Sequence, residues 1–300
     1  MPVRRSPHWL AYLALSVGVL TLGFSAIFTR LADAPGTVVS FYRMAIGTLA
    51  LTIPFVMRFH RGRKISRTGL LLAFVAGVFF ALDLASWATG ISIAGATIPT
   101  LLGNMAPVVV AFGAWLLFKE KLNASFWFGL ILAIGGVITV LNLDFSQGFV
   151  LRPGSLFGLA SAFFYGVYFL ITQKGRDELD ALSFFWLATL SSTLTLLVLS
   201  LVLGTPLTGY SQFTYLNFLA LGLIVQGAGW LAINYAQGYL PASLVAPTLL
   251  SQPVLTAILA GPLLGERFTL TEWIGGAVVV LGIVIVHRSR RRVPPVEIPA

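Results

Sequence analysis

Ten long apolar runs dominate this 300-residue chain and leave it few possible folds. A helix that crosses a bilayer needs roughly 20 mostly apolar residues, because each residue advances the helix by about 1.5 Å. Backbone in lipid must satisfy its own hydrogen bonds, which favours helices over open sheets. We therefore predict an all-α integral membrane protein with ten transmembrane helices, at residues 9–31, 36–57, 68–91, 95–118, 124–142, 154–173, 181–203, 213–236, 242–264 and 270–287.

The composition agrees with lipid as the solvent of the surface. Hydrophobic residues make up 57% of the chain and charged residues only 10%, whereas a soluble domain has about 25% charged residues. The chain has no Cys, so it forms neither disulfides nor Cys-based metal sites. The first apolar run, from Trp9 to Leu31, is too long for a cleavable signal peptide, and we expect it to remain as a membrane helix.

The basic residues predict an orientation in the membrane. The net charge is +9, but Lys and Arg lie between apolar runs, so we interpret them as topology signals and expect no nucleic-acid partner. With the N-terminus inside, fifteen Lys and Arg fall on the inner side, and only Arg30, Arg152 and Arg267 fall on the outer side. By the positive-inside rule both termini are cytoplasmic, in a multi-pass protein of the cell (inner) membrane.

One sequence pattern occurs twice, about half the chain length apart. Residues 265–283 repeat the pattern of residues 119–137 at an offset of 146 residues, which pairs Glu120 with Glu266, Trp127 with Trp273, Gly129 with Gly275 and Gly136 with Gly282. We predict two five-helix repeats, residues 1–146 and 147–300. Because five is odd, the second repeat would be inverted in the membrane, as in carriers that work by alternating access. The alternative is that duplication only doubled a stable bundle.

These residues also resemble a known family. The chain contains a Glu within KEKL and GERF, a W-x-G after each of these, Arg43 within SFYRMAIG, and prolines 107 and 253. Together these features resemble the EamA family of the drug/metabolite transporter superfamily. Aromatic amino-acid exporters of the YddG type look most similar within it. The resemblance implies a ten-helix bundle with the fifth and tenth helices at the periphery, a central cavity, and export of amino acids and related metabolites without a cofactor.

Two charged residues fall inside predicted membrane helices. Arg43 and Asp83 each cost at least ~2.5 kcal/mol on insertion scales, so we expect them to face the bundle interior at a common depth. They would pair or share a water network. One interpretation is a structural ion pair; the other places them on the substrate path. There Arg43 would meet a carboxylate, and Asp83 would meet an amine or carry a proton.

Polar and aromatic residues at helical spacing complete the predicted site. Such residues find no hydrogen-bond partner in lipid, so they favour a cavity lining, although contacts between helices would explain them too. The further substrate-binding candidates are Tyr42, Trp87, Asn104, Tyr165, Tyr168, Trp186, Gln226, Trp230, Asn234 and Gln252. Pro107 and Pro253 interrupt matching helices and are candidates for a hinge or gate, or for a fixed kink.

Outside the predicted site, we expect structural roles. Glu120 and Glu266 would cap neighbouring helix N-termini, and Trp127 and Trp273 would anchor at the interface. Glycines on the fifth and tenth helices would allow close packing of helices or a homodimer contact: Gly129, Gly135, Gly136, Gly275, Gly276 and Gly282.

The sequence gives less support to other classes of function. An intramembrane enzyme lacks a base, because His8, His60 and His287 lie at helix ends or in loops, and no P-loop is present. We therefore predict no enzymatic activity and no metal. The predicted function is secondary export of small metabolites, most of all amino acids including aromatic ones. A multidrug or nucleotide-type exporter of the same fold and a passive channel are the alternatives.

Overall fold

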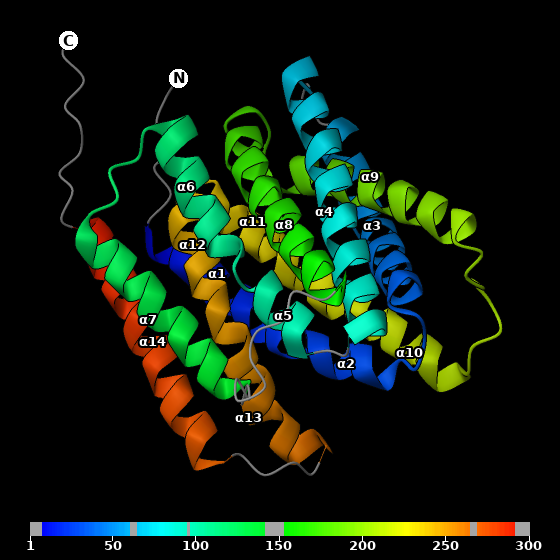
Figure 1. Ribbon diagram of the computed structural model, residues 1–300. Helices are drawn as coiled ribbons and strands as arrows, with labels where there is room; N and C mark the ends of the chain where they lie inside the picture. The colour runs from blue at the N-terminus through cyan, green and yellow to red at the C-terminus, as the bar shows by residue number, and fades with distance from the viewer. Residues whose placement is uncertain (1–7, 61–64, 95–96, 142–152, 265–268, 292–300) are drawn as a thin grey trace.

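The computed structural model describes residues 8–60, 65–94, 97–141, 153–264 and 269–291, and the described residues form helices and turns only. The first half contains α1 (His8–Gly23), α2 (Ser25–Leu31), α3 (Gly36–His60), α4 (Arg67–Ala94), α5 (Thr97–Gly103), α6 (Ala106–Phe118) and α7 (Ala124–Val140) (Figure 1). The second half contains α8 (Pro153–Glu178), α9 (Ala181–Val202), α10 (Gln212–Ala220), η1 (Leu221–Trp230), α11 (Leu231–Gln237), α12 (Ala242–Thr248), η2 (Leu249–Ser251), α13 (Gln252–Leu264) and α14 (Leu270–Arg291).

The predicted ten runs reappear as helical segments in the same order. Among the described residues, nine segments are long and apolar enough to cross a membrane, and Ala124–Val140 is apolar but shorter. The predicted break between the third and fourth runs falls after α4, which continues to Ala94, and before α5, which begins at Thr97. The fold is therefore an all-helical membrane protein with nine or ten long apolar helices.

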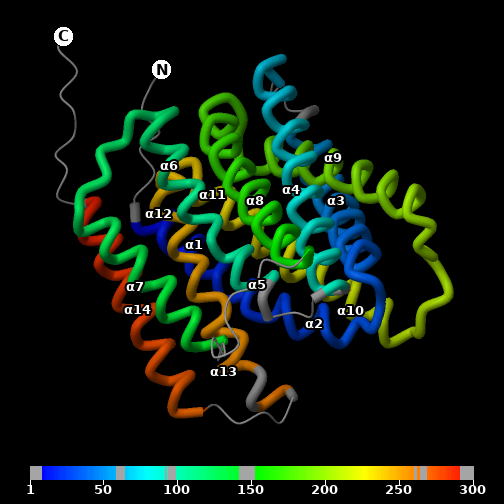
Figure 2. Tube along the Cα trace, viewed as in Figure 1, coloured from blue at the N-terminus to red at the C-terminus, as the bar shows by residue number. Residues whose placement is uncertain are grey.

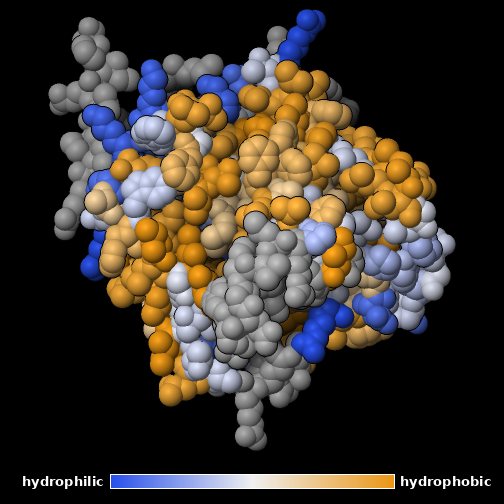
Figure 3. Space-filling view, viewed as in Figure 1, coloured by the Kyte–Doolittle hydropathy of each residue, from blue (hydrophilic) through white to orange (hydrophobic). Residues whose placement is uncertain are grey.

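The surface of the bundle is apolar over much of its area. Large side chains such as Leu116, Leu201 and Leu270 are 69%, 64% and 76% exposed. Hydrophobic residues cover most of the face seen in Figure 3. A soluble monomer rarely exposes apolar patches of this extent, so lipid is the solvent that fits this surface.

The prolines singled out in the sequence begin helices. α5 ends at Gly103 and α6 begins at Ala106, so Pro107 is the second residue of α6. Pro253 is likewise the second residue of α13, which follows the 3₁₀ turn η2. Proline is well tolerated in a first helical turn, where its missing N–H has no partner to lose. The breaks are related by the repeat, since α6 and α13 differ by the same 146 residues at both ends.

The repeated glycines pack α7 directly against α14. A Cβ on Gly129 would lie 2.8 Å from the Gly282 carbonyl oxygen, and a Cβ on Gly136 would lie 2.7 Å from the Gly275 carbonyl oxygen. As residue numbers rise along α7 they fall along α14, so the two helices are antiparallel (Figure 2). Gly129 corresponds to Gly275 and Gly136 to Gly282 in the repeat. The two contacts therefore exchange under a two-fold axis, as an inverted repeat requires.

This helix pair lies at one edge of the bundle, as the family resemblance implied (Figure 1). The expected close packing of its glycines is confirmed for Gly129, Gly136, Gly275 and Gly282, and a homodimer contact stays a prediction. Gly276 faces Val254 on α13, and only Gly135 among the six has open space around it.

Gly136 and its neighbour Gly135 provide a matched test of the packing between α7 and α14. We expect Gly136→Ala to lower the thermal stability of the purified protein, because the new Cβ would lie 2.6 Å from the Val279 nitrogen. Overpacking of this kind costs about 1–3 kcal/mol. Gly135→Ala meets nothing within 4 Å and should be neutral or stabilising. Equal melting temperatures for the two variants in detergent would contradict this packing.

Candidate functional site

The two buried charges lie in one cluster but do not pair directly. Arg43 on α3 is 8% exposed; its Nε donates to Gln226 Oε1 at 2.9 Å and its Nη1 to Ser25 Oγ at 3.3 Å. Asp83 on α4 is 6% exposed and accepts a hydrogen bond from Ser161 Oγ at 2.6 Å. The helices that carry these neutral partners meet beside the charges, because Tyr165, one turn after Ser161, lies 5.9 Å from Trp230, one turn after Gln226. Both charges thus face the interior of the bundle, as predicted, and their common depth in the membrane stays a prediction. The two side chains form no direct ion pair.

A π-helix presents Gln226 and Trp230 to this cluster. Residues Leu221–Trp230 form η1, where an unbroken α-helix was expected. π-Helical turns are rare and often occur at functional sites. Close packing accompanies the distortion, because a Cβ on Gly229 would meet Thr21 Oγ1 at 2.1 Å and a Cβ on Gly47 would meet Gln226 Cγ at 2.7 Å. Gly47 therefore leaves the space through which Gln226 reaches Arg43.

Aromatic rings form the wall beside the charges. The Phe80 ring stacks on Tyr168, with centroids 4.4 Å apart, and meets Trp230 at 4.8 Å. Tyr165 lies 5.9 Å from Trp230 and is nearly parallel to Tyr168 at 6.4 Å. Three predicted aromatics therefore come together with Phe80, and in this conformation they pack on one another.

Unpartnered polar atoms continue from this wall along η1 and α11. Six buried side-chain atoms in the described part of the chain lack a hydrogen-bond partner, and five of them lie on α8, η1 and α11: Thr172 Oγ1, Gln226 Nε2, Trp230 Nε1, Asn234 Oδ1 and Gln237 Oε1. Leaving such an atom unsatisfied costs about 1–3 kcal/mol. Five unpartnered polar atoms on three neighbouring helical segments indicate a place where water or a solute binds.

The other sequence candidates occupy different places. Trp87 Nε1 donates to Thr100 Oγ1 at 3.1 Å, and Asn104 Nδ2 donates to the Thr100 carbonyl at 2.8 Å. A Cβ on Gly103 would lie 3.3 Å from Ser161 Oγ and 3.8 Å from Trp87. The end of α5 with Trp87 therefore borders the Asp83–Ser161 contact.

Among the described residues, Tyr42, Trp186 and Gln252 form no hydrogen bond or ring contact with this cluster. The Tyr42 hydroxyl donates to the Leu207 carbonyl, and its ring stacks on Phe218. Trp186 Nε1 donates to Thr52 Oγ1, and its ring stacks on Phe55 at 4.0 Å. Gln252 begins α13, and its side chain makes no hydrogen bond to a described residue.

Sequence reasoning missed several polar members of the site. Ser161 precedes Tyr165 by four residues, so the helical spacing already placed it on the face that was chosen. Gln237 and Thr172 extend the polar faces of their helices by one turn. Ser25 gave no such signal, because its position depends on the break between α1 and α2.

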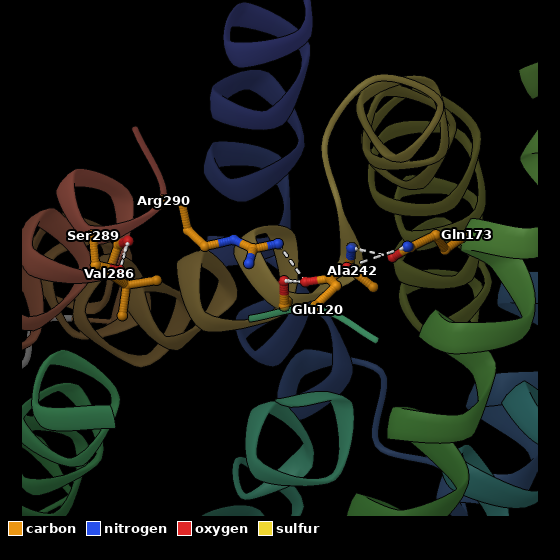
Figure 4. Close-up of polar contacts among 7 residues, drawn as sticks. Glu120, Gln173, Ala242, Val286, Ser289 and Arg290 are labelled. Atoms are coloured by element: carbon orange, nitrogen blue, oxygen red, sulfur yellow. Dashed lines mark hydrogen bonds and ion pairs between the residues drawn. The ribbon is translucent and has the colours of Figure 1, made fainter. Parts of the chain in front are cut away.

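A second polar cluster joins the two halves at one end of α12 (Figure 4). We call Glu120, Gln173, Ser243 and Arg290 the Glu120 cluster. Glu120 follows α6 and forms an ion pair with Arg290 of α14; it accepts from Ser243 Oγ at 2.5 Å and from Gln173 Nε2 at 3.4 Å. Gln173 Oε1 also accepts from the backbone N–H of Ala242, the first residue of α12, at 2.5 Å.

Glu120 lies beside the N-terminus of α12, but its side-chain partners are other side chains, so the predicted capping of backbone N–H groups is not observed. Glu266 lies outside the described residues. All partners of Glu120 belong to the second half, so the cluster ties α12 to the first half. Nearby, His287 on α14 hydrogen-bonds Thr248 at the end of α12. The Glu120 cluster therefore holds in place the short helix that precedes the break before Pro253.

Comparison with known proteins identifies the family. The model of the EamA-like transporter family matches residues 9–142 and again residues 152–288. The chain belongs to this family: it is a multi-pass membrane transporter with two EamA segments, and not an enzyme.

Individual relatives are distant and span nearly the whole chain. An uncharacterized transporter of Archaeoglobus fulgidus is 27% identical over 278 residues, covering 92% of this chain and 96% of the relative. The uncharacterized transporter YdfC of Bacillus subtilis is 25% identical over 274 residues (90% and 88%). The pseudopaline exporter CntI of Pseudomonas aeruginosa is 25% identical over 262 residues (87% and 89%).

A solved crystal structure shares the fold, with a TM-score of 0.80 at 17% identity, covering 94% of this chain and 99% of that one. The family prediction is thus confirmed. The narrower resemblance to YddG-type aromatic amino-acid exporters has no counterpart among these relatives.

The Glu120 cluster gives a prediction about access to α12. In the natural Cys-free chain, Ala242→Cys provides a single buried thiol, which is 0% exposed at this position. Adding Glu120→Gln removes the ion pair with Arg290, and we expect maleimide labelling of the thiol to become roughly 5- to 100-fold faster. Glu178→Gln, at an exposed carboxylate, is the control. Unchanged labelling in the Glu120 variant would show that the cluster does not hold α12.

Proposed function

We propose that this transporter exports small carboxylate-bearing metabolites, amino acids including aromatic ones among them, by alternating access. The observation that carries the proposal is the arrangement of Arg43 and Asp83. Each is buried in the same cluster and held by neutral side chains, Arg43 by Gln226 and Ser25, Asp83 by Ser161. Opposite charges held apart in this way suit the carboxylate and the amine of a zwitterion. The stacking wall of Phe80, Tyr168 and Trp230 suits an apolar or aromatic body.

Alternating access is supported by the relation between the halves. The antiparallel contact of α7 with α14 exchanges repeat-equivalent glycines, and the breaks before α6 and α13 also match. Two such halves can exchange conformations at similar energy, which opens the site to one side and then to the other. One relative named above is an exporter of a metabolite, which supports this direction of transport.

The alternatives fit the described residues less well. A nucleotide-type exporter needs several basic groups for phosphates. Only Arg43 and Arg176 are buried basic residues in the described ranges, and Arg176 donates to the backbone carbonyls of Asn234 and Leu179. An exporter of apolar drugs has no need of two buried charges. A passive channel is distinguished by counterflow, in which only a carrier couples the two directions of solute movement.

Replacement of Arg43 tests the proposal. In liposomes, we expect Arg43→Ala to reduce counterflow of carboxylate-bearing amino acids roughly 10- to 100-fold, because a hydrogen bond to a charged group contributes ~1.5–3 kcal/mol. Arg43→Lys should recover only part of the activity, since Lys lacks the planar two-pronged donor. Arg58→Ala, at a half-exposed arginine near Asp180, is the control. Wild-type counterflow by Arg43→Ala would remove Arg43 from the substrate site.

A further inference from the structure

The unpartnered atoms of η1 and α11 can be assigned as donors or acceptors from their neighbours. Arg43 only donates, so the Gln226 atom that it contacts is the amide oxygen, and the free atom is the NH₂ group. Asn234 Nδ2 donates to the Trp230 carbonyl and Gln237 Nε2 to the Phe169 carbonyl, which only accept. Their free atoms are therefore the amide oxygens. Trp230 Nε1 is a donor in any arrangement.

The free atoms thus change character along the helix. Near Arg43 they are donors, on Gln226 and Trp230. About two turns further on they are acceptors, on Asn234 and Gln237. The Tyr168 hydroxyl accepts from Asn234 Nδ2 at 3.0 Å, and the hydroxyl of Thr172 lies one turn after Tyr168 on the facing helix. All five side chains are at most 3% exposed. We call the first group the donor end and the second group, with Thr172, the acceptor end.

A positive charge limits what binds at the acceptor end. Arg176 lies one turn after Thr172 on α8, is 5% exposed, and its Nε donates to the Asn234 carbonyl at 2.8 Å. An ammonium group would be repelled there at low effective dielectric. Neutral donors such as a hydroxyl or an amide N–H are compatible with it.

We propose that the acceptor end is a specificity subsite for a neutral hydrogen-bond donor at the far end of the transported solute. The carboxylate binds at the donor end with Arg43, the apolar body lies against Tyr168 and Trp230, and the distal group donates to Asn234 and Gln237. From Gln226 to Asn234 the chain makes about two helical turns, an advance on the order of 10 Å, so the solute that fits is elongated. This inference rests on the proposed function and names the solute class more narrowly: a carboxylate with an apolar body and a terminal hydroxyl or amide.

The matched pair tyrosine and phenylalanine tests the subsite, since they differ by one distal hydroxyl. A site that pairs a hydroxyl discriminates strongly against the analogue without it, because its polar groups are then left unpaired. In liposome counterflow we expect wild-type protein to prefer tyrosine by at least roughly fivefold. Gln237→Met and Thr172→Val, which keep side-chain size, should bring the ratio of tyrosine to phenylalanine transport toward one, because tyrosine loses a hydrogen-bond partner and phenylalanine no longer leaves a polar group unpaired. Ser200→Ala removes the sixth unpartnered atom, on α9, and is the matched control.

The possible results separate the two proposals. Transport of both amino acids without a preference, or with a preference that survives both substitutions, overturns the subsite while the proposed function stands. Equal losses for both amino acids in both variants also overturn it, because they indicate a structural role. No counterflow of either amino acid, nor of glutamine and norleucine as a second pair with and without a distal amide, overturns the proposed function and the subsite with it.

Discussion

The cost of an unpartnered polar group in a lipid-embedded bundle governs the structure around Arg43 and Asp83. Neither charge is exposed, and neither satisfies the other through a direct contact. Instead, Gln226, Ser25 and Ser161 supply neutral partners from three other helical segments. A buried charge with only neutral partners is more costly than an ion pair, and such sites persist where the free charge is used. The π-helical turn around Gln226 and the close approach at Gly47 both serve this arrangement.

The repeat places such a site between two related halves of the chain. Repeat-equivalent glycines bring α7 and α14 into backbone contact at the edge of the bundle, and this contact is symmetric within the chain. Away from that edge the halves are also closely packed: a Cβ on Gly77 of α4 would lie 2.2 Å from the Ala188 carbonyl oxygen of α9, and a Cβ on Gly158 of α8 would lie 2.9 Å from Pro99 Cα of α5. Polar contacts such as the Glu120 cluster join the halves as well.

Much of the fold followed from the sequence, because hydropathy and the repeat are strong signals. The ten apolar runs, the break after α4 and the peripheral place of α7 and α14 were all expected. The π-helix was not; its Gly222 and Gly229 pack tightly against Ile46 of α3 and Thr21 of α1, contacts that no local sequence pattern shows. For the same reason the sequence placed Arg43 and Asp83 in one region but not their partners. Helical spacing grouped Tyr165, Tyr168 and Trp230 correctly, whereas Tyr42 and Trp186 face other neighbours, which no one-dimensional pattern distinguishes.

The central claim is that the buried cluster around Asp83 becomes accessible from each side of the membrane in turn. Ser161→Cys, a nearly isosteric change beside Asp83, places one thiol there in an otherwise Cys-free chain. Labelling with an impermeant maleimide in right-side-out and inside-out vesicles tests the claim most directly. The account predicts labelling from both sides, slowed on both by a transported amino acid. Labelling from one side only, under all conditions, would contradict it.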